Sequence, residues 1–106
     1  RIMLIDKIKN LSNVFFEDIK SYKRHIHANP EISFEEYKTA DFIEAKLREW
    51  GISDISRMAN TGVIAVIEAN NKSNKVFALR ADIDALPIQE VEGREYGSKN
   101  PGIMHA

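Results

Sequence analysis

The spacing of apolar residues changes near Thr61, and this change limits the fold more than any other feature of the sequence. Upstream, apolar side chains recur at steps of three and four residues, which is typical of one face of a long amphipathic helix. They are Ile5, Ile8, Leu11, Phe15, Ile19, Tyr22 and Ile26. Downstream, residues 63–67 form a mostly β-branched run that is apolar on both faces, as a buried strand requires. The chain is therefore expected to combine helices with buried strands.

Local signals place the ends of two helices. Pro30 ends the first helix, since proline cannot continue a helical backbone. Ser33 and Glu36 have the spacing of a capping box that would open a second helix. Gly51 is a natural cap for the C-terminal end of that helix. Its apolar stripe consists of Ala40, Ile43, Leu47 and Trp50.

A second strand is expected shortly after the first. Residues 76–79 are apolar, and the polar residues 70–74 could form a short turn from the first strand, so the pattern predicts an antiparallel hairpin. This second strand becomes charged at Arg80, Asp82 and Asp84 before Pro87 stops it. The polar residues 89–100 are predicted to form a surface loop.

Charge and composition exclude several classes of function. With 15 Lys and Arg against 16 Asp and Glu, the net charge is −1, so no basic excess favours nucleic acid or anionic membranes as partners. No apolar run approaches the roughly 20 residues that span a bilayer, and no secretory signal is evident, so we expect a cytoplasmic protein. Cysteine is absent, which excludes disulfides and thiolate metal ligands within these residues.

Three alternating charges are the first candidates for chemistry. Arg80, Asp82 and Asp84 would project from one face of the predicted strand. They are open to two interpretations. One is a structural ion pair at the end of a core strand, and the other is a site where a carboxylate orients a metal ligand or holds charge near a reacting group.

The histidines and one tight turn have simpler interpretations. His25 and His27 end the first helix, where they are expected to cap carbonyl groups or to interact with the helix dipole. Their spacing does not put both on one helix face, which argues against a metal site formed by this pair. Thr61 and Gly62 indicate a tight turn before the strand. His105 stands at the end of the sequence and is a natural place to look for a site.

Seven motifs, in order, resemble one family of enzymes. They are Arg24-x-x-His27-x-x-Pro30-Glu31, Ser33-Phe34-x-Glu36, Thr39, Thr61-Gly62-Val63, the block from Leu79 to Ile88, Ser98, and Gly102-Ile103-Met104-His105-Ala106. Together they resemble the amidohydrolase branch of the aminoacylase and carboxypeptidase-type metallopeptidases. That branch includes hippurate hydrolase, indole-acetyl amino acid hydrolases and N-acetyldiaminopimelate deacetylase. The Arg-Ala-Asp-x-Asp-Ala-Leu-Pro sequence within the block from Leu79 to Ile88 is the most specific of these motifs.

The resemblance implies an α/β fold and an incomplete domain. Residues 1–106 would be the N-terminal portion of a three-layer αβα zinc-peptidase-like catalytic domain, here two helices followed by two buried strands. The rest of that domain and an inserted lid or dimerisation domain would lie outside these residues. A homodimer would form through the absent domain.

The resemblance also implies a reaction. It is the metal-dependent hydrolysis of the amide bond of N-acyl amino acids or related small, peptide-like amides. Two divalent ions, zinc, manganese, nickel or cobalt, would share a water molecule that attacks the carbonyl group, with a glutamate as general base. In the family, Met104-His105-Ala106 is followed by Cys-Gly-His-Asp, which supplies metal ligands. We therefore expect no metal ligand among these 106 residues, no metal on this chain alone, and no activity of the chain alone.

The resemblance assigns roles to a few residues. Asp82 matches an aspartate that, in related branches, supports a metal-binding histidine, although Arg80 stands where that histidine would be. Arg80, Asp84 and His105 would lie next to the substrate site. The alternative, from another class, is a complete non-catalytic α/β module that mediates protein contacts. The next four encoded residues would separate the two: Cys-Gly-His-Asp indicates the enzyme, and a stop codon indicates the module.

Overall fold

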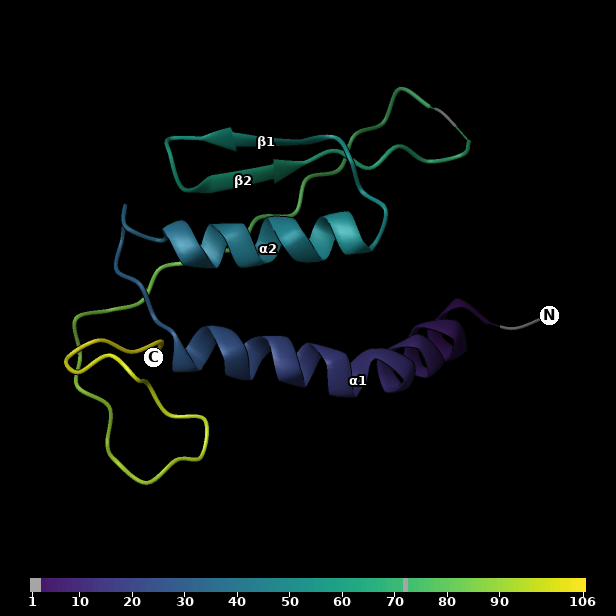
Figure 1. The fold of residues 1–106 in the computed structure, drawn as a ribbon. Coiled ribbons are helices and arrows are strands. Elements are labelled where there is room, and N and C mark those ends of the chain that lie inside the picture. The colour runs from purple at the N-terminus through teal and green to yellow at the C-terminus, as the bar shows by residue number, and fades with distance from the viewer. Residues whose placement is uncertain (1–2, 72) are drawn as a thin grey trace.

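Two helices precede a small antiparallel sheet in the computed structural model, which describes residues 3–71 and 73–106 (Figure 1). The elements are α1 (Leu4–Ala28), α2 (Tyr37–Glu49), β1 (Ile55–Met58) and β2 (Gly62–Ala65). In Figure 1, α2 lies between the hairpin and α1, and the C-terminal residues gather beside the end of α1. The predicted α/β class, with two helices followed by two strands, is confirmed.

The end of α1 is capped by Asn29 rather than by the histidines. The Asn29 amide donates to the carbonyl oxygens of His25 and Ile26, and its side chain donates to the carbonyl of His25 at 2.8 Å. The buried Pro30 follows, as the sequence predicted. The capping role expected of His25 and His27 was wrong, because Asn29 binds the carbonyls of His25 and Ile26 and both rings make other contacts. Both histidines do lie in the last turn of α1, and the alternative, an interaction with the helix dipole, stays a prediction.

The capping box predicted at Ser33 and Glu36 is also wrong. Phe34 has a φ of 68°, in the left-handed region, so the chain turns between the two residues and the local geometry of a capping box is lost. Helix α2 begins at Tyr37, and the side chain of Glu36 makes no cap hydrogen bond. The other end agrees with the prediction: Gly51, with a φ of 83°, donates its amide to the carbonyl of Arg48.

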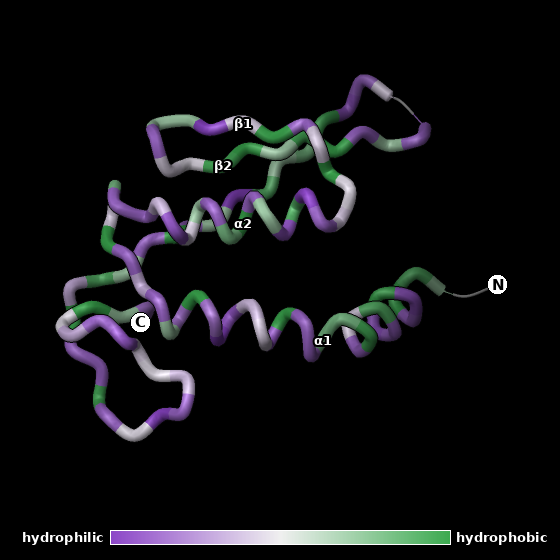
Figure 2. Tube along the Cα trace, viewed as in Figure 1, coloured by the Kyte–Doolittle hydropathy of each residue, from purple (hydrophilic) through white to green (hydrophobic). Residues whose placement is uncertain are grey.

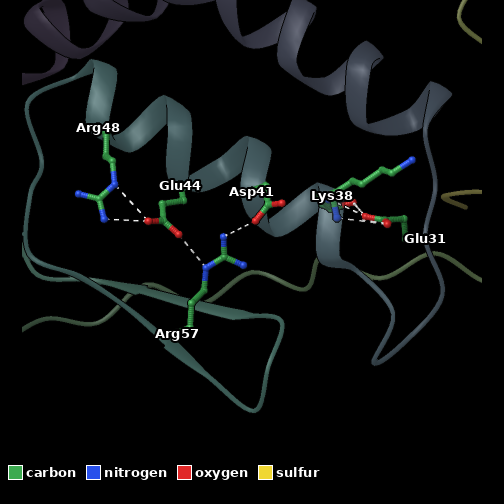
Figure 3. A network of polar contacts seen from close by, with 7 residues as sticks. Glu31, Lys38, Asp41, Glu44, Arg48 and Arg57 are labelled. Carbon is green, nitrogen blue, oxygen red and sulfur yellow. Dashed lines mark hydrogen bonds and ion pairs between the residues drawn. The ribbon is translucent and has the colours of Figure 1, made fainter.

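The N-terminal end of α2 is capped instead by Glu31. Its carboxylate accepts hydrogen bonds from the backbone amides of Lys38 and Thr39, at 3.2 and 2.5 Å, and from the Thr39 hydroxyl at 2.7 Å (Figure 3). A carboxylate at this end also complements the positive end of the helix dipole. Glu31 comes from the segment before the helix, which therefore joins the end of α1 to the start of α2.

The sheet uses different segments from those predicted. β2 coincides with the start of the predicted strand 63–67, but its partner is β1, paired from Ile55 opposite Ala65 to Met58 opposite Gly62. The turn between them contains Ala59 and Asn60 in left-handed conformations. The first strand was missed because its sequence has neither an alternating pattern nor an apolar run.

The predicted strand 76–79 does not form within the described residues. Apolar content alone suggested it, but a strand also needs a hydrogen-bonded neighbour, and no described segment pairs with it. The prediction that both strands are buried was wrong as well: in the first, Ile64, Val66 and Ile67 are exposed, and in the second so are Val76, Phe77 and Leu79. Lys72, in the predicted turn 70–74, lies outside the described residues.

Aromatic contacts join the two helices near the C-terminal half of α1. Tyr22 lies 5.9 Å from the Trp50 ring and 6.2 Å from the Phe42 ring, and His25 stacks on Phe42 at 4.2 Å, measured between ring centroids. The N-terminal part of α1 extends past these contacts and is rich in apolar residues (Figure 2). The large apolar side chains from Ile5 to Ile19 are exposed. No helix in the described part of the chain is long and apolar enough to cross a membrane.

Ion pairs hold the hairpin against α2. The guanidinium of Arg57 on β1 contacts Asp41 and Glu44, each at 2.8 Å, and Glu44 also pairs with Arg48 at 2.8 Å (Figure 3). Exposed pairs of this kind contribute little to the overall stability of a protein. Their role here is to orient the hairpin, whose turn carries Thr61 toward the cavity described below.

Candidate functional site

The three alternating charges do not lie on a strand, and they separate into two environments. Arg80 and Asp82 form an exposed ion pair of 2.7 Å. Asp84 is half-buried, and its negative charge acts to raise the pKa of His105, although burial and His27 outweigh this effect. The two aspartates therefore differ in their surroundings.

A cavity of about 400 Å³ adjoins all three charges. Its wall includes Glu36, Thr61 and Gly62 together with residues 80–84. The side chain of Glu36 is buried, and its Oε2 has no hydrogen-bond partner within residues 3–71 and 73–106. Burial alone would raise the pKa of Glu36, but hydrogen bonds from the Thr61 hydroxyl and from the backbone amides of Glu36 and Phe34 outweigh it, so the pKa is lowered. Three carboxylates and one guanidinium give this wall a negative balance.

The last residues of the chain are held between the end of α1 and residues 85–90. Leu86 and Met104 exchange two backbone hydrogen bonds, of 2.9 and 3.0 Å. The amide of Lys99 donates to the carbonyl of Ala28 at 2.9 Å, and the side chain of Asn100 donates to the carbonyl of Pro30 at 2.8 Å. These contacts carry His105 back to the C-terminal end of α1.

His105 borders a second cavity, of about 420 Å³, which is also lined by Lys23, His27, Arg94 and Tyr96. Its Nε2 atom is buried and has no hydrogen-bond partner among the residues that the structure describes. Burial lowers the pKa of His105 and the neighbouring His27 lowers it further, while Asp84 acts in the opposite direction. The lowered pKa favours the uncharged imidazole, the form that can accept a proton or ligate a metal.

Glu90 is a buried residue that the sequence analysis missed, because it lies in the polar segment 89–100 expected to be a surface loop. Its Oε1 lies 2.8 Å from Nε2 of His27, and its Oε2 accepts the amide of Ser98 at 2.5 Å. The Ser98 amide, and after it His27, lower the pKa of Glu90. A signal was present, since His27 and Ser98 both belong to the motifs of the family resemblance and both contact this carboxylate.

The described residues do not form a metal centre. Within residues 3–71 and 73–106, no three histidine, cysteine, aspartate or glutamate side chains come together in a way that could hold an ion. These side chains therefore do not fit a divalent metal by themselves, and they do not form a metal-dependent hydrolytic site on their own. What they provide is two cavities and the scaffold around His105.

We expect the protein to lose stability in acid through Glu36 and Glu90. A carboxyl whose pKa is lower in the folded than in the unfolded protein stabilises the fold above its unfolded value and loses that contribution as pH falls through its folded value. The loss should begin near the ordinary glutamate value of 4.5 and continue below it. The midpoint temperature of thermal unfolding, measured at successively lower pH from pH 7, should decrease within this pH window. Glu90→Gln should flatten that dependence, and an unchanged slope would contradict the assignment.

The chain matches no family model, but it is similar to known hydrolases over almost its whole length. It is 44% identical over 98% of its length to an N-acyl-L-amino acid amidohydrolase of Geobacillus stearothermophilus, and 40% identical over 97% to a hippurate hydrolase of Campylobacter jejuni. The chain spans 28% and 26% of these relatives.

A solved structure supports the same relationship. The YXEP protein of Bacillus subtilis, described as a dinuclear metal-binding peptidase of the M20 family, superposes on 88% of this chain with a TM-score of 0.80 and 40% identity. The matched region is 26% of that protein. Fold and sequence therefore agree over the same part of the chain.

Proposed function

This chain belongs to the M20 family of metal-dependent amidohydrolases and peptidases, and from that premise we propose that it is part of an enzyme that hydrolyses N-acyl amino acids or related small amides. The 44% identity with an N-acyl-L-amino acid amidohydrolase across 98% of the chain carries this proposal. Residues 1–106 form the N-terminal portion of the catalytic domain, and the rest of that domain and a lid or dimerisation domain complete the enzyme. The enzyme acts in the cytoplasm on small, peptide-like substrates, and it forms a homodimer through the lid or dimerisation domain.

Two divalent ions, of zinc, manganese, nickel or cobalt, supply the water-activating chemistry in this proposal. The dinuclear description of the M20 relative supports them. In this proposal the residues of this chain position the groups of the site, and they do not ligate the metal ions. His105, partly buried and with a lowered pKa, borders the site together with Asp84, and the electrostatic effect of Asp84 on His105 supports that placement. Asp82 is the carboxylate that steadies a metal ligand, and its partner Arg80 holds it in place.

A substrate panel tests the proposal. The full-length protein is loaded with metal, its metal content is measured, and it is assayed with acetyl, benzoyl and indole-acetyl amino acids. We expect release of the free amino acid from at least one of them, with about two ions bound per chain. A metal-loaded protein that releases no amino acid from any of these amides would show that the proposed activity is wrong. A non-catalytic module would also give that result, and reading the next four encoded residues identifies it.

A further inference from the structure

We infer that Glu90 is a positioning residue, which ties the end of α1 to the segment 98–105 and so sets the place of His105 at the edge of the proposed site. The inference rests on the proposed function for its catalytic consequence. Its structural part depends only on contacts within this chain.

Both oxygens of the Glu90 carboxylate are used, and each holds a different part of the chain. Oε1 pairs with Nε2 of His27 at 2.8 Å, in the last turn of α1. Oε2 accepts the backbone amide of Ser98 at 2.5 Å. The Glu90 side chain is only 7% exposed and that of His27 11%, so water cannot readily replace either contact. Arg94 approaches the same carboxylate at 3.6 Å from the exposed side.

Hydrogen bonds connect Ser98 to the residues that precede His105. The Ser98 hydroxyl donates to the carbonyl of Ile103 at 2.7 Å, which closes the segment into a compact loop. The amide of Gly102 donates to the side chain of Gln89, the neighbour of Glu90, at 2.6 Å. The hydrogen bonds between Met104 and Leu86 then fix the residue just before His105. A shift at Ser98 therefore moves this end of the segment.

The ring of His27 links the same carboxylate to the cavity beside His105. His27 lies 6.4 Å from the His105 ring and 5.8 Å, edge-on, from the Tyr96 ring, measured between centroids. The guanidinium of Arg24 covers the Tyr96 ring at 4.7 Å. One buried carboxylate thus sets the orientation of a histidine that itself faces His105.

Replacing Glu90 by glutamine removes one acceptor without changing the shape of the side chain. A carboxylate accepts from both His27 and Ser98, whereas an amide accepts through its oxygen only and presents its NH₂ group to the other donor. The NH₂ group then faces either the Ser98 amide, which can only donate, or Nε2 of His27, which must lose its proton to accept. Either way the carboxylate's charge-assisted bonds are lost, and the segment is expected to shift. A misplacement of about 1 Å near reacting groups can lower a rate by about 100-fold. Since substrate contacts are not altered directly, kcat should change more than KM.

The experiment uses the full-length, metal-loaded enzyme with N-acetylmethionine as the probe. The variants are Glu90→Gln, His27→Ala, the double variant, and His27→Gln, which keeps a donor toward Glu90. The matched control is Glu92→Gln, an exposed glutamate of the same loop. We expect Glu90→Gln and His27→Ala each to lower kcat by about 10- to 100-fold, with KM nearly unchanged. The double variant should lose no more than the worse single variant, His27→Gln should recover most of the rate, and Glu92→Gln should match the unaltered enzyme.

A second readout does not depend on activity. The imidazole NMR signals of His105 should move in Glu90→Gln and stay in place in Glu92→Gln. Unmoved His105 signals, or a kcat for Glu90→Gln equal to that of the control, would overturn the inference even if the enzyme hydrolyses its substrates normally. An inactive unaltered enzyme with shifted His105 signals in Glu90→Gln would instead refute the proposed function and keep the positioning role. If Glu90→Gln does not fold, His27→Ala and its rescue by His27→Gln decide the question.

Discussion

Exhaustive chelation is expected to abolish hydrolysis of N-acyl amino acids by the full-length protein, and added divalent metal is expected to restore it. Water without a metal has a pKa far above neutral and is a poor nucleophile at pH 7, whereas a metal-bound water can reach a pKa of about 7. The expected loss is therefore essentially the whole catalysed rate. Rates are measured before chelation, after chelation, and after separate additions of zinc, manganese, nickel and cobalt. A rate that survives removal of all bound metal would contradict the metal mechanism.

The isolated 106 residues serve as the matched control for this prediction. Their described part brings no three metal-ligating side chains together, so adding metal to this piece should produce no turnover of the same substrates. Measurable hydrolysis by the piece would mean that its own residues carry the reaction. That result would move the proposed site from the rest of the enzyme to the cavities beside Glu36 or His105.

Glu31→Ala is expected to lower the free energy of unfolding of the full-length protein by about 2 kcal/mol. The substitution removes an acceptor of three hydrogen bonds from Lys38 and Thr39 and leaves the first amides of α2 without a cap. It also removes a negative charge from the positive end of the helix. Denaturant unfolding, followed by circular dichroism and compared with the unaltered protein, measures the change.

Two further variants separate the cap from a general effect of charge. Glu35→Ala removes an exposed carboxylate four residues away, and it should change the free energy of unfolding by about 0.5 kcal/mol or less. Glu31→Gln keeps one acceptor and loses the charge, so its effect should lie between the two alanine variants. Equal unfolding midpoints for Glu31→Ala and Glu35→Ala would show that Glu31 does not stabilise the start of α2.

The sequence predicted the features that depend on neighbours along the chain. The three- and four-residue spacing in α1, the proline after it and Gly51 at the end of α2 all act within one or two helical turns. The motif resemblance identified the family for a related reason. The motifs are specific residue types in a specific order, which can be read from the sequence without a structure. The comparisons with known hydrolases confirm that identification.

Predictions that needed a distant partner went wrong. Residues 76–79 have the apolar composition of a strand, but pairing depends on a second segment, and β2 pairs with β1 instead. One local prediction failed too: Ser33 and Glu36 have the right spacing for a cap, yet Glu31 caps α2 because Phe34 turns the chain. In both cases local composition was compatible with two structures, and packing selected one.

The candidate site divides in the same way. The sequence alone identified Arg80, Asp82, Asp84 and His105 as residues that could carry chemistry, since charge and imidazole are properties of single side chains. Only the tertiary structure decided that the charge of Asp84 acts on His105, and that Glu90 is buried against His27, 63 positions away in the chain. Bringing together two residues that far apart in the chain costs conformational entropy. No local sequence pattern indicates that such a contact will form. It forms because a buried carboxylate and the buried groups that hydrogen-bond to it would each be unstable without the other.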